Sequence, residues 1–342
     1  MRPASSSPFP ISPKSCAGAK AMIHDVVKQG SEWLRNVPAR AALRYCNRPD
    51  VRARMGLRHE AALARHRPRI PELIPADRAI VDQLDRRGVA VTSIHALGLA
   101  GGDGMVDIAA GLARRFTARA HGEWASGKPF IIVPPGDIVG APAIFHWGLH
   151  DRLLDIAEAY IGLPAAYDGV AINYTVADGR EISTRKWHQD WEDRRMLKVA
   201  VYLHDVDEDG GPFQVVARGD MRQSDRNGYS YELADDAELA RRLGQDYRRD
   251  IMSCTGARGT VIFADTARLF HRGKPATARD RAALFYSYFA QAPRHPFYCE
   301  RTGMRRRDLY RLAEDLPRRQ REAVMWRRRI ALPLRIIPPA TL

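Results

Sequence analysis

A chain of 342 residues can form one large domain or two modest ones, and its 45% hydrophobic residues can bury a substantial core. No run approaches 18 consecutive apolar residues, which excludes a transmembrane helix, and four cysteines without metal-site or disulfide spacing indicate a reducing, cytoplasmic compartment. The net charge of +14 is uneven, since residues 1–72 and 301–342 hold 26 basic and nine acidic residues and leave the middle of the chain slightly acidic.

The basic flanks have two interpretations. A basic surface indicates an anionic partner, which is a membrane, to which the protein would bind peripherally, nucleic acid or an acidic substrate. The other interpretation is that the arginines lie on solvated helix faces and bind no partner. Composition alone does not decide between the two.

The N-terminal flank contains two different patterns. Residues 1–21 are rich in Ser, Pro and Ala and contain no acidic residue, which predicts a disordered leader. Over residues 22–75, apolar side chains recur at helical spacing among many arginines, which predicts a basic helical extension. Its apolar stripe either lies on a membrane surface or packs against its own domain.

Helices and strands alternate in the next part of the chain. Periodicity and β-branched runs predict a helix at 76–87, a strand at 89–94, a helix at 105–118, a strand with a turn at 129–139 and a helix at 149–161.

Strands dominate from residue 171 onward. Further runs predict strands at 171–175, 197–203, 212–217, 259–265 and 282–289. The polar stretch 220–250 predicts a helical insertion whose length suits a lid over an active site. Residues 293–342 predict a basic C-terminal helical extension, in which Trp326 among arginines suits an anionic surface. A C-terminal helix that packs back on the core is the alternative.

His188 and Asp190 are the first candidates for chemistry. On a strand, residues two apart point to the same face, so an imidazole and a carboxylate would lie side by side. His271, which follows a later predicted strand, would complete three ligands on one face of a metal. Two histidines and one carboxylate with open positions form the facial triad of non-heme Fe(II) oxygenases.

The segments around these residues carry a family resemblance. W-H-Q-D at 187–190 precedes L-K-V-A-V-Y-L-H-D-V-D-E-D-G-G-P, then F-A-D-T-A-R-L-F-H-R-G, then an arginine before the last predicted strand. In this order and spacing, the motifs resemble the phytanoyl-CoA dioxygenase-like branch of Fe(II)/2-oxoglutarate-dependent oxygenases. The resemblance covers roughly residues 76 to 290, so we expect a jelly-roll oxygenase domain at 76–292.

The resemblance implies both the fold and the ligands of this domain. The expected fold is mainly β with flanking helices, around a double-stranded β-helix (jelly-roll, cupin-like) core. His188, Asp190 and His271 would bind Fe(II), and Arg281 would bind the distal carboxylate of 2-oxoglutarate. Arg279 shares strand parity with Arg281 and is its rival for this role.

Three neighbouring residues are further candidates. Asn173 is assigned to the cosubstrate pocket, and Tyr174 and Trp191 are assigned to the substrate pocket. Ordinary packing is the alternative for each of the three.

The implied reaction consumes 2-oxoglutarate and O2, releases succinate and CO2, and hydroxylates a C–H bond of a small or lipid-like, anionic substrate. One alternative is a non-catalytic basic jelly-roll protein that binds nucleic acid or an anionic membrane. An oxygenase that acts on nucleic acid is a third possibility, and it would bind with a steep salt dependence.

Overall fold

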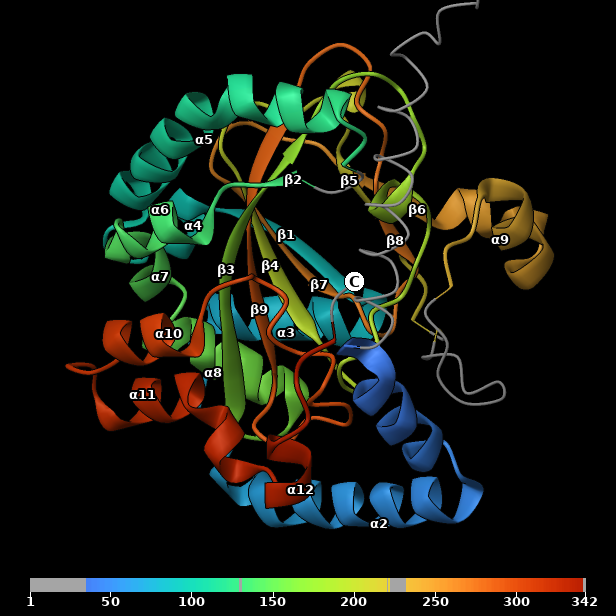
Figure 1. Ribbon diagram of the computed structural model, residues 1–342, viewed down its shortest axis with the longest axis vertical. Helices are drawn as coiled ribbons and strands as arrows, with labels where there is room; N and C mark the ends of the chain where they lie inside the picture. The colour runs from blue at the N-terminus through green and yellow to red at the C-terminus, as the bar shows by residue number, and fades with distance from the viewer. Residues whose placement is uncertain (1–34, 129–130, 220, 222–231, 341–342) are drawn as a thin grey trace, which may run out of the picture.

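The computed structural model describes residues 35–128, 131–219, 221 and 232–340. The expected leader at 1–21 and the first part of the N-terminal extension lie outside these residues. Two antiparallel sheets form the centre of the molecule (Figure 1). The larger sheet contains, in spatial order, β1 (Val89–Ser93), β7 (Thr260–Asp265), β4 (Leu197–Tyr202), β9 (Arg281–Ala290), β3 (Ala165–Thr175) and β2 (Ile131–Ile132). The smaller sheet contains β6 (Ile251–Cys254), β5 (Phe213–Val216) and β8 (His271–Gly273).

This arrangement confirms the expected double-stranded β-helix core with flanking helices. Chain-distant strands alternate within the larger sheet, and β9 lies between β4 and β3. The expectation of a mainly β chain is not met, because helices hold more of the described residues than strands do. The reason is that helices cover the larger sheet over the whole of its outer face.

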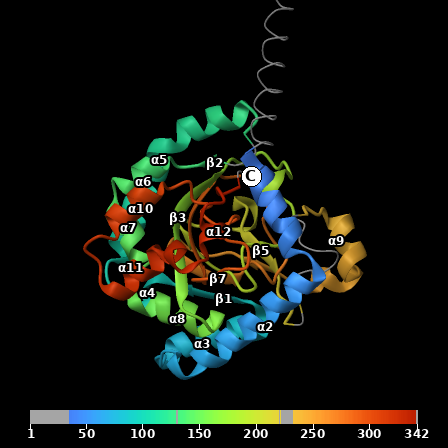
Figure 2. The ribbon, with the colours of Figure 1, turned by 60° about the horizontal axis from the view of Figure 1, so that its bottom comes forward.

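These helices form an arc around the outer face of the larger sheet (Figure 2). They are α3 (Pro75–Arg87), α4 (Ile94–Leu97), α5 (Gly102–Ala125), α6 (Pro135–Val139), α7 (Pro142–Trp147), α8 (Asp151–Ile161), α10 (Arg306–Leu312) and α11 (Arg318–Val324). Their apolar faces and the outward side chains of the sheet form the main core of the protein.

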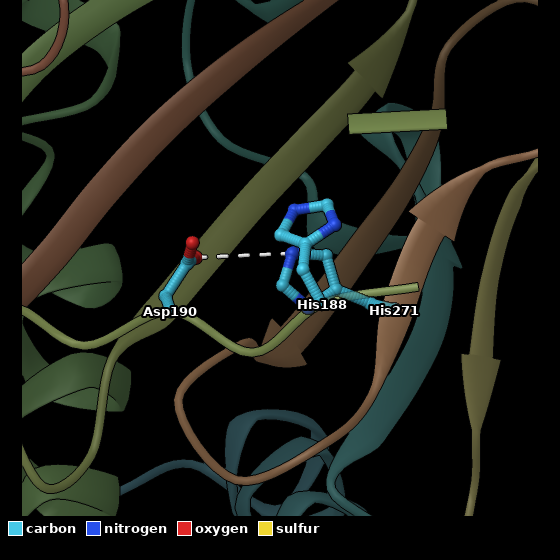
Figure 3. Close-up of side chains that lie close together, drawn as sticks. All are labelled: His188, Asp190 and His271. Carbon is cyan, nitrogen blue, oxygen red and sulfur yellow. Dashed lines mark ion pairs between the residues drawn. The ribbon is translucent and has the colours of Figure 1, made fainter. Parts of the chain in front are cut away.

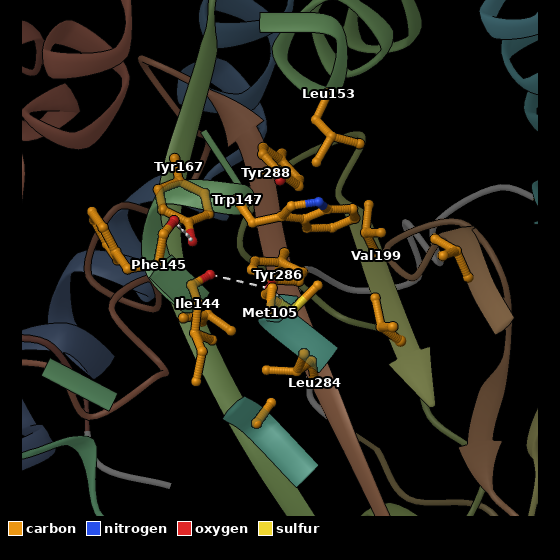
Figure 4. Close-up of a cluster of buried hydrophobic side chains, with 14 of the residues drawn as sticks. Met105, Ile144, Phe145, Trp147, Leu153, Tyr167, Val199, Leu284, Tyr286 and Tyr288 are labelled. Atoms are coloured by element: carbon orange, nitrogen blue, oxygen red, sulfur yellow. Dashed lines mark hydrogen bonds between the residues drawn. The ribbon is translucent and has the colours of Figure 1, made fainter. Parts of the chain in front are cut away.

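Three tyrosines of β3 and β9 contribute large buried rings to the main core, between the sheet and the helices (Figure 4). The phenol groups of Tyr167, Tyr286 and Tyr288 are buried, yet each donates a hydrogen bond to a backbone carbonyl in or next to α7. The three distances lie between 2.6 and 3.1 Å. These bonds satisfy the polar end of each ring while its apolar body fills the space between sheet and helices.

The described parts of both basic extensions pack on the core. The helix at 35–46 and the C-terminal segment that contains α12 (Leu332–Arg335) meet over Trp191 and Tyr298. Trp326 is 2% exposed, and its ring packs edge-on against Phe289 at 5.0 Å between centroids. The described parts of these extensions therefore follow the packing alternative, in which apolar side chains face the core and the arginines surround them.

Two regions differ from the expected elements. Within the described residues 131–139, β2 is the one strand, because Pro134 and Pro135 start the short helix α6 there. Part of the expected lid, residue 220 and residues 222–231, lies outside the described residues. The rest of the insertion contains α9 (Asp236–Leu243), which lies beside the smaller sheet (Figure 1), and a 3-10 segment. The strand β6 follows directly after the insertion and was not expected.

Helix α2 (Pro49–His66) connects the helix at 35–46 to the rest of the domain. Short 3-10 turns complete the described elements, and these are η1 (Arg67–Arg69), η2 (Ser183–Arg185), η3 (Glu208–Gly210), η4 (Gln245–Asp250) and η5 (Trp326–Arg329).

Candidate metal centre and cosubstrate pocket

His188 and His271 face each other across an antiparallel backbone pair. The amide of His188 donates to the carbonyl of His271 at 3.0 Å, and the reverse bond is 2.9 Å long. This pairing brings the two rings to 4.2 Å between centroids. The segment around His188 is not the regular strand that the sequence predicted. It forms two isolated β-bridges after η2, and the bridge from His188 to His271 pairs the segment with β8 and holds it in place.

Asp190 completes the group, opposite the two rings (Figure 3). Its backbone amide donates to the carbonyl of Thr266 at 2.8 Å, and its Oδ2 lies 3.8 Å from Nε2 of His271. One ligand atom from each residue lies within 4.8 Å of the others, and all three side chains are buried. Metal–ligand bonds of about 2.0–2.2 Å place two ligands at most about 4.4 Å apart, so a small side-chain rotation lets all three bind one ion.

Both imidazoles are held in the form that binds metals. Nδ1 of His188 lies 2.8 Å from the carbonyl of Lys186, and Nδ1 of His271 lies 3.2 Å from that of Leu269. A carbonyl only accepts, so each Nδ1 carries the proton and leaves Nε2 with a lone pair. Burial lowers the pKa of His188, and burial followed by the charge of His188 lowers the pKa of His271 to about 3. Both rings are therefore neutral near pH 7.

Lys198 is a site residue that the sequence analysis missed. Its Nζ lies 2.6 Å from Oδ2 of Asp190. Burial acts to raise the pKa of Asp190, but the Lys198 charge and the two imidazoles outweigh it and hold the pKa below its usual range. The sequence held one indication of this role, which is that Lys198 is a single lysine inside the apolar run of β4. A lysine that is largely removed from water needs an anionic partner.

Arg281 and Arg279 have different environments, although they share strand parity. Arg281, at the start of β9, is buried and donates to the carbonyl of Gly211 and, at 3.2 Å, to Oγ1 of Thr175. No carboxylate of the described residues forms an ion pair with it. Arg279 is 59% exposed and pairs with Asp207. A buried guanidinium without an anionic partner fits an anionic ligand, whereas Arg279 already has its partner.

The remaining sequence candidates do not all lie in one place. Asn173 and Thr175 share the inner face of β3, and Oδ1 of Asn173 is buried without a hydrogen-bond donor among the described residues. Tyr174 points to the opposite face, where its hydroxyl donates to Asp280 at 2.8 Å. Trp191 is stacked on Tyr298, with ring centroids 4.1 Å apart. The structure thus brings Asn173 to the inner face, leaves Tyr174 outside, and buries Trp191 beside the ligand group.

The residues present fit an iron and 2-oxoglutarate site. Two neutral imidazoles and one carboxylate are the donors that a non-heme Fe(II) centre uses. The guanidinium of Arg281, which has no carboxylate partner among the described residues, fits the distal carboxylate of 2-oxoglutarate, and Asn173 lies on a strand of the same sheet.

No helix of the described residues combines the length and the apolar character that crossing a bilayer requires.

Comparison with solved structures finds similar chains of low sequence identity. EctD from S. alaskensis in its apo form is 22% identical over 65% of this chain and 80% of that chain, with a TM-score of 0.45. AviO1 from Streptomyces viridochromogenes is 19% identical over 65% of this chain and 98% of that chain, with a TM-score of 0.43. HygX from Streptomyces hygroscopicus, solved with nickel and 2-oxoglutarate, is 16% identical over 64% of this chain and 88% of that chain, with a TM-score of 0.40. No protein-family model and no curated protein sequence matches the chain.

Proposed function

We propose that this protein is an Fe(II)/2-oxoglutarate-dependent oxygenase that hydroxylates a C–H bond of a small molecule. The observation that carries the proposal is the convergence of His188, Asp190 and His271 in the interior of a jelly roll. The motifs around these residues support the narrower assignment to the phytanoyl-CoA dioxygenase-like branch. When bound, the metal and cosubstrate supply the oxidation, in which 2-oxoglutarate and O2 yield succinate, CO2 and one oxygen atom for the substrate.

The residues of the chain hold and orient the reactants. The lone pairs of His188 and His271 and the anionic Asp190 would bind the metal and leave other coordination positions open. Arg281 would meet the distal carboxylate of 2-oxoglutarate with two parallel hydrogen bonds, which a lysine does not reproduce.

The inner face of the sheet supplies the surroundings for this chemistry. Asn173 would donate a hydrogen bond from its amide Nδ2 to the cosubstrate, because 2-oxoglutarate offers only acceptor oxygens. Burial of the ligand group keeps bulk water away from the reacting atoms, which strengthens each charge interaction in the site.

Binding experiments test the proposal before any substrate is known. Calorimetry of the full-length protein should show one Mn(II) or anaerobic Fe(II) ion per chain, and 2-oxoglutarate should bind only after the metal. Aerobic Fe(II) protein should then convert 2-oxoglutarate to succinate. A chain that binds neither metal nor 2-oxoglutarate would instead favour the non-catalytic binding protein.

A further inference from the structure

Arg301 lies in the loop between β9 and α10 and is not explained by the metal or cosubstrate. Its side chain is 25% exposed, and its Nη1 is buried without a hydrogen-bond partner among the described residues. Arg301 forms an ion pair with the buried Glu192, whose Oε1 lies 3.6 Å from Nε, too far for a direct hydrogen bond. The guanidinium therefore retains donors for another group.

The position of Arg301 connects it with the metal centre. Glu192 follows Asp190 by two residues, and its Oε2 accepts a hydrogen bond from the amide of Trp191 at 2.9 Å. Arg301 thus lies against the turn that carries the metal ligand.

The loop around Arg301 is held in one conformation. The buried carboxylate of Asp168 accepts the amides of Glu300 at 2.8 Å and Arg301 at 3.1 Å. Glu300 has φ of 67°, a left-handed conformation that few non-glycine residues adopt. Two hydrogen bonds from Arg306, of 2.6 and 2.7 Å, hold its carboxylate. The C-terminal helices therefore fix the backbone from which Arg301 extends.

We propose that Arg301 binds an anionic group of the substrate, a carboxylate or a phosphate, and holds the substrate beside the metal. This inference rests on the proposed oxygenase function and names its substrate class. A guanidinium on a fixed backbone loses little conformational freedom when it binds an oxyanion, and its planar donors match two oxygen atoms. Lys198 and Arg281 do not serve this role, because they face Asp190 and the cosubstrate.

Paramagnetic relaxation of small probes tests this inference without catalysis. The full-length protein is loaded with Mn(II) and excess 2-oxoglutarate, which keeps probes away from Arg281. Proton relaxation is then measured for phenylacetate, benzylphosphonate and the neutral phenylacetamide, which share one apolar body. We expect at least one anion to be relaxed more strongly than the amide, and the stronger anion identifies the carboxylate or phosphate class.

The variants distinguish anion binding at Arg301 from a general attraction of anions to the arginines of this loop. Arg301→Gln should weaken binding of the preferred anion about ten- to a hundredfold, the size of a charge-assisted hydrogen bond, and Arg301→Lys should retain part of it. Arg305→Gln, an exposed arginine of the same loop, should change nothing. Mn(II) and 2-oxoglutarate affinities, measured on the same samples, should be equal in all variants.

Two results would overturn the inference. One is relaxation of the anions no greater than that of the amide in the wild-type protein, including relaxation of none of the probes. The other is an anion preference that Arg301→Gln leaves unchanged. If the wild-type protein binds neither Mn(II) nor 2-oxoglutarate, the proposed function fails, and that result is distinct from both.

Discussion

The two faces of the six-stranded sheet differ in their side chains. On the outer face, Tyr286 and Tyr288 of β9 and Val199 of β4 pack into the main core under the helices. On the inner face, the same two strands carry Arg281 and Lys198, which interact with polar and charged groups. Because side chains alternate along a strand, one stretch of chain supplies stability to one layer and chemistry to the other. Substitutions on the two faces should therefore have separable effects.

The largest effect is expected on the outer face. Tyr286→Ala removes a fully buried ring, and we expect it to lower the free energy of unfolding by about 3–5 kcal/mol, as for other large-to-small core substitutions. Chemical denaturation measures this loss. Metal affinity of the folded protein, measured by calorimetry, should stay within a factor of two or so, on the order of experimental scatter.

Phe285 is the matched control for this prediction. It precedes Tyr286, faces the inner side and is only partly buried. Phe285→Ala should cost less stability than Tyr286→Ala. If Tyr286→Ala also abolished metal binding in the folded fraction, the separation between the faces would not hold.

Asp190→Ala should have the largest effect on the metal centre. Loss of a residue that merely supports a metal ligand lowers affinity about 10–100-fold, so loss of the ligand itself should exceed about a hundredfold. Titration with Mn(II) or anaerobic Fe(II) checks this, and succinate formation should fall to background. A variant that binds metal like the wild type would exclude Asp190 as a ligand.

The sequence predicted this group of residues because each of them carries its own local signal. His188, Asp190 and His271 occur in motifs with fixed spacing, and Arg281 directly precedes an apolar strand. The same local information did not decide between Asn173 and Tyr174, because β3 is buried on both faces and shows no polar alternation. Their directions depend on the pairing of β3 with β9, which is a tertiary contact.

Lys198 and Trp326 are two further residues whose environment could not be predicted from the local sequence. Lys198 appears as one polar residue in a strand until the fold brings Asp190 to it. Trp326 among arginines resembles a surface motif, but its ring is buried against Phe289. The strand positions and helix periods of the core were predictable from local patterns, whereas contacts between distant segments were not.

Arg281→Ala should weaken 2-oxoglutarate binding about ten- to a hundredfold, because a charge-assisted pair is worth about 1.5–3 kcal/mol. Calorimetry with the Mn(II) protein measures this change, and metal binding should persist. Arg281→Lys should recover only part of the affinity. Arg279→Ala is the control, and a loss confined to Arg279→Ala would show that the cosubstrate arginine was wrongly chosen.

The smallest expected effect is at Lys198. Its ammonium group shares Oδ2 of Asp190 with the incoming metal, so the two cations compete. Lys198→Met should therefore raise Mn(II) affinity, by about tenfold if one charge-assisted contact is lost. The thermal shift on adding Mn(II) should increase as well. Weaker metal binding in this variant would mean that Lys198 supports the ligand group instead of opposing the ion.

The position of β9 has a consequence for how the protein is made. Synthesis runs from the N-terminus, so β3 and β4 leave the ribosome well before β9, the strand that joins them. Until then each exposes an unpaired edge to the crowded cell, and such edges promote aggregation. The nascent chain should thus depend on chaperones from the synthesis of β3 until β9 emerges, and truncations that end before residue 281 should accumulate as insoluble protein.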